Sequence, residues 1–262
     1  MNRRVLVQGA MAATLLGAGT ARAQVSDLND AINKAGRQRM LSQRMGKAYL
    51  ALAQSVEENL ARQVLDRSLA LFDRQLVELK AYAANPELKD TYLALESAWS
   101  DYKTSLIGAA PTKAGGAAVM ASAGKVLALA HKGTQQYEAL LNKPIGKLVN
   151  VAGRQRMLSQ RMAAFYFASS IQADGGAAQA EIGKARSEFL AGLQLLRSAP
   201  EATSRIKDEL QLADAQWLLF DNALQKSTSY GASRQLSDVF VASENLLQVM
   251  DRVTGLYSEL KS

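Results

Sequence analysis

The eleven-residue string AGRQRMLSQRM occurs twice in this 262-residue chain, at 35–45 and at 152–162, without a difference between the copies. Sliding the chain by 117 residues superposes the two copies and also aligns Tyr49 with Tyr166. Self-similarity at a fixed period is typical of proteins built from repeated structural units. The chain is therefore expected to contain two copies of one unit in tandem.

Each unit is predicted to contain four helices. Apolar residues recur at three- and four-residue spacing in long windows rich in Ala, Leu, Gln, Lys and Glu, and no alternating strand pattern is present. The predicted breaks between helices lie near 56–59, 85–88, 108–116, 173–177, 198–204 and 229–233. The predicted fold class is all-α, with two tandem four-helix bundles at 24–142 and 143–262.

The joint between the two units is short and contains Pro144. Four helices that run up and down return the chain to the end at which it began. The motif helix of the second unit then starts at the same end as the first motif helix and points in the same direction. This arrangement predicts a parallel pair of motif helices related by a pseudo-two-fold axis.

The first 23 residues have the features of a signal peptide. Arg3 and Arg4 precede an uncharged run rich in Ala, Gly and Leu, and Ala-Arg-Ala at 21–23 has the form of a cleavage site. We expect cleavage before Gln24 and export to the periplasm, through either the Sec or the twin-arginine (Tat) route. The alternative is an uncleaved N-terminal anchor, although the apolar run is short and glycine-rich for a bilayer span.

Positive charge is concentrated in the repeated motif. Removing residues 1–23 leaves 28 basic and 24 acidic residues, and six of the basic residues are motif arginines. A nucleic-acid-binding protein usually spreads Lys and Arg over a face, so nucleic acid is not expected as a partner. The chain has no cysteine and one histidine, His131. We therefore expect no metal, no cofactor and no enzyme activity, and interpret His131 as an ordinary helix residue.

One face of the motif helix combines small residues with an arginine. At helical spacing it runs through Ile32, Ala35, Arg39, Ser42, Gly46 and Tyr49, and in the second copy through Val149, Ala152, Arg156, Ser159, Ala163 and Tyr166. Glycine inside a helix costs about 1 kcal/mol relative to alanine. Gly36 and Gly153 nevertheless precede the stripe arginines by three residues, which indicates close approach of another group.

Neither stripe arginine has an acidic residue near it in the sequence. Residues 31–56 and 139–173 each contain five basic residues and no acidic one. If the two stripes face each other, two buried like charges meet, which is unfavourable unless something neutralises them. A small anion held by both guanidinium groups would do so. We therefore predict a small-anion site formed by Gly36, Arg39, Gly153 and Arg156; the alternative is close helix packing alone.

Six other motif residues are expected to support this site: Arg37, Ser42, Arg44, Arg154, Ser159 and Arg161. The four arginines among them either raise the local positive potential or pair with carboxylates of neighbouring helices. We favour ion pairing for at least one of the two such arginines in each motif, because arginines in folded proteins more often form structural ion pairs. Trp99 and Trp217 are expected in the cores of the two bundles.

The motif resembles the signature helix of the PilJ-type domain, the sensory N-terminal domain of type IV pilus chemotaxis transducers. The resemblance covers about fourteen residues per unit, INKAGRQRMLSQRM at 32–45 and VNVAGRQRMLSQRM at 149–162. The motif is also similar to the P-box of periplasmic nitrate/nitrite sensor kinases. The resemblance implies four-helix bundles that pair through this helix. It also implies nitrate or nitrite on the dyad, bound by Arg39, Arg156 and backbone near the preceding glycines.

The box of the nitrate sensors differs at the positions of Arg37, Gln38, Leu41 and Gln43, so a small anion is better supported than nitrate itself. The chain also shows no HAMP-like linker and no signalling output domain. We expect a monomeric periplasmic module that binds one small anion, nitrate or nitrite by resemblance, and reports to a membrane sensor or transducer protein. The alternative is a structural or adaptor protein of the envelope or of the pilus and chemotaxis machinery, without a small ligand.

Overall fold

The computed structural model describes residues 24–225 and 232–260, and every regular element in these ranges is an α-helix. The helices are α1 (Leu28–Leu52), α2 (Glu58–Tyr82), α3 (Pro86–Ile107), α4 (Gly116–Leu141), α5 (Pro144–Ser169), α6 (Ala178–Ser198), α7 (Ser204–Gln225) and α8 (Ala232–Glu259). The expected signal peptide at 1–23 and most of the break expected at 229–233 lie outside the described residues. The predicted all-α fold class is confirmed.

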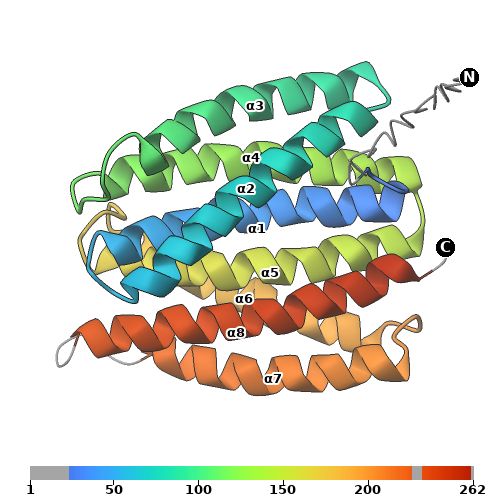
Figure 1. Ribbon diagram of the computed structural model, residues 1–262. Coiled ribbons are helices and arrows are strands. Elements are labelled where there is room, and N and C mark those ends of the chain that lie inside the picture. The colour runs from blue at the N-terminus through green and yellow to red at the C-terminus, as the bar shows by residue number, and fades with distance from the viewer. Residues whose placement is uncertain (1–23, 226–231, 261–262) are drawn as a thin grey trace, which may run out of the picture.

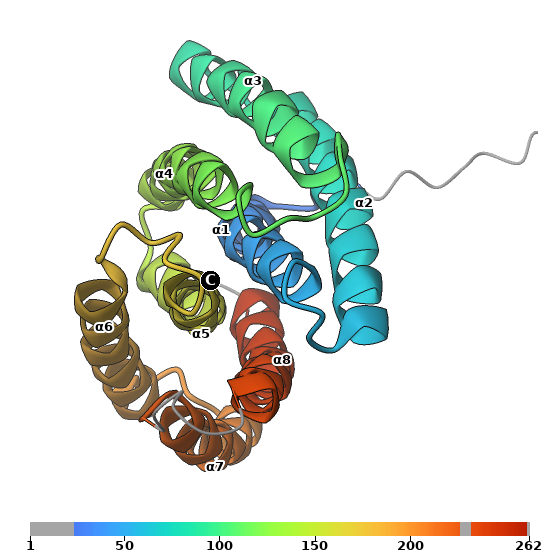
Figure 2. The ribbon, with the colours of Figure 1, turned by 90° about the vertical axis from the view of Figure 1, so that its left-hand side faces the viewer.

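The eight helices form two bundles that share a side. Seen along the helices, α1 to α4 make one ring and α5 to α8 make the other (Figure 2). α1 and α5 lie side by side at the centre of the molecule, where the two rings meet (Figures 1 and 2). The chain therefore folds as the predicted tandem pair of four-helix bundles, with the two motif helices in contact.

α1 and α5 run in the same direction, as the short joint predicts. Gly36 lies against Gly153 in the N-terminal half of the two helices. At the other end, the side-chain amide of Gln54, just after α1, donates a hydrogen bond of 3.2 Å to the carbonyl of Phe167. The N-terminal halves of the two helices thus contact each other, and so do their C-terminal ends, which requires that the helices run parallel.

The last helix of the first bundle, α4, is equivalent to the last helix of the second bundle, α8. The hydroxyl of Tyr137 on α4 donates to the carbonyl of Leu79 at 3.0 Å, and the hydroxyl of Tyr257 on α8 donates to the carbonyl of Leu196 at 2.8 Å. Both tyrosines are fully buried. The same buried hydrogen bond in both units shows that the repeat extends beyond the motif, and it aligns α4 with α8 at a shift of 120 residues.

The joint between α4 and α5 is made by residues suited to ending and starting helices. α4 ends at Leu141, and Asn142 follows in the left-handed conformation, with φ of 47°, which asparagine tolerates better than most residues. α5 begins at Pro144, whose fixed φ suits the first position of a helix. Two residues between the helices are enough to bring α5 back beside α1.

Stacked aromatic rings fill the two bundle cores. The ring centroids of Phe72 and Trp99 are 4.1 Å apart, and those of Phe189 and Trp217 are 4.5 Å apart. Both tryptophans are buried, so their predicted place in the cores is confirmed. Within the described part of the chain, no helix has the length and apolarity that a membrane span requires.

Candidate anion site

The two stripe arginines converge where α1 meets α5, and the side chains of both are 0% exposed. A Cβ atom on Gly36 would lie 3.1 Å from Nη2 of Arg39 and 3.6 Å from Nη2 of Arg156. A Cβ atom on Gly153 would lie 3.2 Å from Nη2 of Arg156 and 3.6 Å from Nη2 of Arg39. Each guanidinium group therefore lies beside both glycines, and the fold brings these four residues together.

Each arginine also reaches across to the opposite motif helix. Nη2 of Arg39 donates to the carbonyl of Asn150 at 3.3 Å, and Nη2 of Arg156 donates to the carbonyl of Asn33 at 3.1 Å. Asn33 and Asn150 are equivalent residues of the two repeats, 117 positions apart. The backbone contacts of the two arginines thus obey the pseudo-two-fold symmetry.

The charge environment of the two arginines breaks this symmetry. Nη1 of Arg156 donates to Oδ1 of Asp251 on α8 at 2.5 Å, and the same oxygen accepts a hydrogen bond of 3.0 Å from Arg37. Burial acts to raise the pKa of Asp251, but Arg156 and Arg37 hold it well below its usual range. The sequence places no acidic residue near Arg156, yet the fold supplies a counter-ion, Asp251, from 95 residues further along the chain.

Arg39 has no such counter-ion. Its Nη1 lies 3.2 Å from Nδ1 of His131 on α4. In the described ranges, no carboxylate forms an ion pair with Arg39, and its Nε has no hydrogen-bond partner. Burial, reinforced by the positive charges of Arg154 and Arg156, lowers the pKa of Arg39 to about 9. The side chain therefore stays charged at pH 7. The charge of Glu138 on α4 favours this charged form, but no carboxylate of the described residues forms an ion pair with Arg39.

His131 contacts Arg39 but does not neutralise it. A guanidinium group can only donate, so Nδ1 of His131 accepts this hydrogen bond and the neutral ring carries its proton on Nε2. Burial, followed by the charges of Arg39 and Arg154, lowers the pKa of His131 to about 4. The interpretation of His131 as an ordinary helix residue needs correction, because its ring covers one end of a buried arginine.

The other four motif arginines all form ion pairs with carboxylates of α6 or α8. The pairs are Arg37–Asp251, Arg44–Glu244, Arg154–Glu188 and Arg161–Glu181. Glu244 also accepts a hydrogen bond of 2.7 Å from the fully buried ammonium group of Lys47. The predicted pairing of these arginines with neighbouring helices is therefore confirmed.

The two serines of the motif bond within their own helices. Ser42 and Ser159 donate to the carbonyls of Arg39 and Arg156, one turn earlier, at 2.8 and 2.9 Å. Further along α1, a Cβ atom on Gly46 would meet the hydroxyl of Tyr102 on α3 at 3.3 Å. The stripe therefore faces α5 in its first half and turns toward its own bundle in its second half. A seven-residue spacing drifts by about 20° per repeat on a straight helix, and this drift contributes to the turn.

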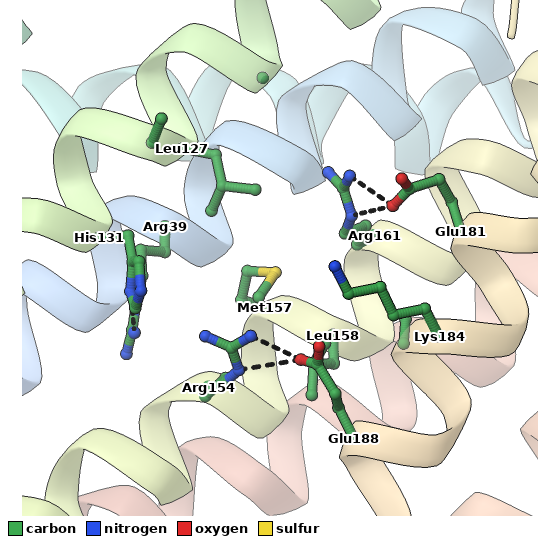
Figure 3. A pocket seen from close by; sticks show the side chains of 13 residues that line it. Arg39, Leu127, His131, Arg154, Met157, Leu158, Arg161, Glu181, Lys184 and Glu188 are labelled. Atoms are coloured by element: carbon green, nitrogen blue, oxygen red, sulfur yellow. Dashed lines mark hydrogen bonds and ion pairs between the residues drawn. The ribbon is translucent and has the colours of Figure 1, made fainter. Parts of the chain in front are cut away.

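A cavity of about 300 Å³ lies beside Arg39, between α4, α5 and α6 (Figure 3). Leu127 and Leu158 form part of its apolar lining. Lys184 reaches into the space between the Arg154–Glu188 and Arg161–Glu181 pairs (Figure 3). Charged groups thus surround one side of a partly apolar space, an arrangement common in binding sites for small ionic molecules.

Comparison with known proteins agrees with the two-unit architecture. The PilJ family, described as type IV pili methyl-accepting chemotaxis transducer N-term, matches residues 21–131 and 142–241. The comparisons with curated proteins and with solved structures gave no match. Each matched segment contains one motif helix and most of one bundle. The N-terminal domains of such transducers are sensory regions rather than enzymes. The chain belongs to the PilJ family and carries two copies of its domain in tandem.

Proposed function

We propose that this protein is an exported, periplasmic sensory module that binds one small oxyanion, nitrate or nitrite, between α1 and α5. Its membership of a family of transducer sensory domains supports the sensory role. The observation that carries the anion is the convergence of Arg39 and Arg156 on Gly36 and Gly153. Two planar groups of N–H donors at one point suit a small planar oxyanion.

The charges at the crossing match one negative charge. Asp251 pairs with both Arg156 and Arg37, and Glu138 acts on Arg39 without forming an ion pair, so three cations face two carboxylates. A monovalent oxyanion beside Arg39 would balance the uncompensated guanidinium charge, and Nη2 of Arg156 would donate from the other side. The absence of side chains at Gly36 and Gly153 lets both guanidinium groups lie against the helix backbones, where they would donate to the anion.

One chain supplies both halves of this site, so we expect a monomer that binds one anion. A change in the contact between α1 and α5 on binding would then be passed to a membrane sensor or transducer protein. The motif helices are well placed for this role, because they form the largest part of the contact between the two bundles.

A second candidate function is that of a structural or adaptor protein of the envelope or of the pilus and chemotaxis machinery. The ion pairs of the other four motif arginines favour it, since these arginines hold neighbouring helices together. Under this alternative, nitrate does not raise the melting temperature.

Isothermal titration with nitrate and with nitrite in a chloride-free buffer tests the proposal. We expect about one site per chain, stabilisation that grows with ligand concentration, and loss of binding in Arg39→Gln. Arg197→Gln is the matched control, because Arg197 is an exposed arginine that pairs with Asp214 away from the crossing. A wild type that binds neither ion, or one ligand per two chains in a dimer, would contradict the proposal.

A further inference from the structure

α4 and α8 occupy the same place in the two bundles, so their residues can be compared position by position. Besides the two buried tyrosines, the equivalent motif residues Gln43 and Gln160 mark this correspondence. Gln43 donates to the carbonyl of Ala123 on α4 at 3.3 Å, and Gln160 donates to the carbonyl of Ser243 on α8 at 2.9 Å. Both pairs of contacts give a shift of 120 residues between the two helices.

Two acidic residues of α8 have no acidic counterpart on α4. At this shift, Asp251 corresponds to His131, and Glu244 corresponds to Gly124. On α8 these two carboxylates neutralise buried and half-buried cations of the motif helices. On α4 the histidine is neutral at pH 7 and the glycine has no side chain. In the described residues, α4 therefore forms no ion pair with a motif arginine, and its one charge that acts on Arg39 is that of Glu138, from beyond ion-pair distance.

The glycine at 124, in place of a glutamate, helps to form the cavity. Gly124 and His131 both line it, and a Cβ atom on Gly124 would meet no atom within 4 Å. In the second bundle, the place that corresponds to Gly124 is filled by the side chain of Glu244, which is mostly buried. The cavity thus lies where the other half of the molecule holds carboxylates.

The groups around the cavity carry an excess of positive charge. Four cationic side chains line it against two carboxylates: Arg39, Arg154, Arg161 and Lys184 against Glu181 and Glu188. Arg39 is fully buried behind His131 and has no carboxylate partner in the described part of the chain. A buried charge of this kind is unfavourable until a counter-charge is brought near it. When no anion is bound between α1 and α5, this excess of two positive charges would be balanced by a ligand with two negative charges.

We propose that this cavity binds a small organic dicarboxylate. One carboxylate would accept hydrogen bonds from Nε2–H of His131 and from Arg154, and so take the place that Asp251 has in the second bundle. The charge of Arg39 behind the imidazole strengthens this donor. A carbon chain would lie against Leu127 and Leu158, with the second carboxylate near Lys184. A volume of about 300 Å³ is at the small end of ligand pockets.

This site differs from the proposed nitrate site between α1 and α5. The cavity opens between α4, α5 and α6, and Gly124 and Lys184 line it at positions that play no part in the crossing of the motif helices. Arg39 is the residue that the two sites share. The inference therefore does not rest on nitrate binding, and variants on α4 separate the two.

Thermal melting and calorimetry of the full chain at pH 7 test the inference. The probes are malonate, succinate and glutarate, with succinamide as the uncharged analogue of succinate. We expect at least one dicarboxylate to raise the melting temperature in proportion to the logarithm of its concentration, and succinamide to leave it unchanged. If all three dicarboxylates fail to bind the wild type, the inference is overturned.

Two substitutions locate the ligand. His131→Asp would supply on α4 the carboxylate that α8 already has. We expect a higher melting temperature without ligand and at least a tenfold loss of dicarboxylate affinity. The control Ala121→Asp adds the same charge at an exposed position of α4 that does not line the cavity, and should bind like the wild type. Dicarboxylate binding by His131→Asp at wild-type affinity would overturn the inference.

The second substitution fills the space without adding charge. Gly124→Leu would extend a side chain into the cavity, so dicarboxylate affinity should fall at least tenfold while nitrate affinity stays unchanged. Gly183→Leu is the matched control, since a Cβ atom there also meets no atom within 4 Å and the residue does not line the cavity. If nitrate binds and no dicarboxylate does, only this inference fails. If a dicarboxylate binds and nitrate does not, only the nitrate proposal fails.

Discussion

Gly36 and Gly153 face each other where α1 meets α5, and a Cβ atom on either residue would lie 3.9 Å from Cα of the other. This distance is ordinary van der Waals contact, so the two backbones alone would accept a methyl group. The tighter contact is with the guanidinium groups, at 3.1 and 3.2 Å. The two glycines therefore leave room for the arginines more than for the helices.

We expect Gly36→Ala to weaken anion binding more than it weakens the fold. The added methyl group would push Nη2 of Arg39 by a few tenths of an ångström. The greater helix propensity of alanine, about 1 kcal/mol, offsets this strain, so the free energy of unfolding should change by less than about 1 kcal/mol. Nitrate affinity should fall about tenfold or more, and calorimetry together with urea unfolding measures both effects.

Gly255→Ala is the control for this substitution. Gly255 lies on α8, and a Cβ atom there meets nothing within 4 Å. This variant should gain up to about 1 kcal/mol in stability and bind nitrate like the wild type. Unchanged nitrate affinity in Gly36→Ala would show that the glycine is not part of an anion site.

The two stripe arginines should differ in what their removal does to stability. Arg39→Gln removes a buried cation without a counter-ion in the described residues, so the free energy of unfolding should stay unchanged or rise by about 0–2 kcal/mol. Arg156→Gln breaks the pair with Asp251 and should lower it by about 1–3 kcal/mol. This loss is below the full cost of a broken buried pair, because Asp251 keeps Arg37 and is partly exposed.

Urea unfolding of both variants at pH 7, without nitrate, measures this difference. The double variant Arg156→Gln with Asp251→Asn should recover part of the loss, because it removes the unpaired carboxylate as well. Equal effects of the two single variants would mean that Asp251 does not distinguish the two halves of the site.

Glu244 should make stability depend on pH in the acid range. Burial acts to raise its pKa, but Lys47 and Arg44 lower it from 4.5 to about 2. A carboxyl group with a lower pKa in the folded state contributes stability that is complete above the unfolded pKa. That stability is lost as the pH falls toward the folded pKa. We expect the free energy of unfolding to fall by about 3 kcal/mol between pH 5 and pH 2 from this group.

Urea unfolding at a series of pH values measures this slope, and Glu244→Gln is the variant to compare. It should be less stable than the wild type at pH 7, since Lys47 stays buried without its carboxylate. Its stability should also change less between pH 5 and pH 2. A slope equal to that of the wild type would mean that other carboxyl groups dominate the acid range.

Much of the fold and part of the site could be predicted from the sequence. The exact repeat and the short joint at Pro144 imply two parallel motif helices, and the glycine three residues before each stripe arginine indicates where they meet. Asp251 could not be predicted as the partner of Arg156. Helical periodicity identifies the buried face of α8, but it does not show which residues of α5 that face contacts.

The sequence did contain an indication that His131 takes the place of Asp251, although the repeated motif alone does not show it. The shift that aligns Tyr137 with Tyr257 also aligns His131 with Asp251. A comparison restricted to the identical segments misses this pair, because α4 and α8 have diverged in sequence. The role of the histidine depends on Arg39 pointing toward α4, and that direction follows only from the packing of the three helices.

The short joint after Asn142 also has a genetic consequence. In an assembly of two identical chains, every mutation appears on both sides of the symmetry axis, so equivalent positions always hold the same residue. Here the two halves are encoded separately within one gene, and each can mutate while the other is preserved. A histidine at 131 and an aspartate at 251 can coexist only under this condition. Two units in one chain thus allow one half to hold the counter-ion Asp251 while the equivalent position of the other half holds His131.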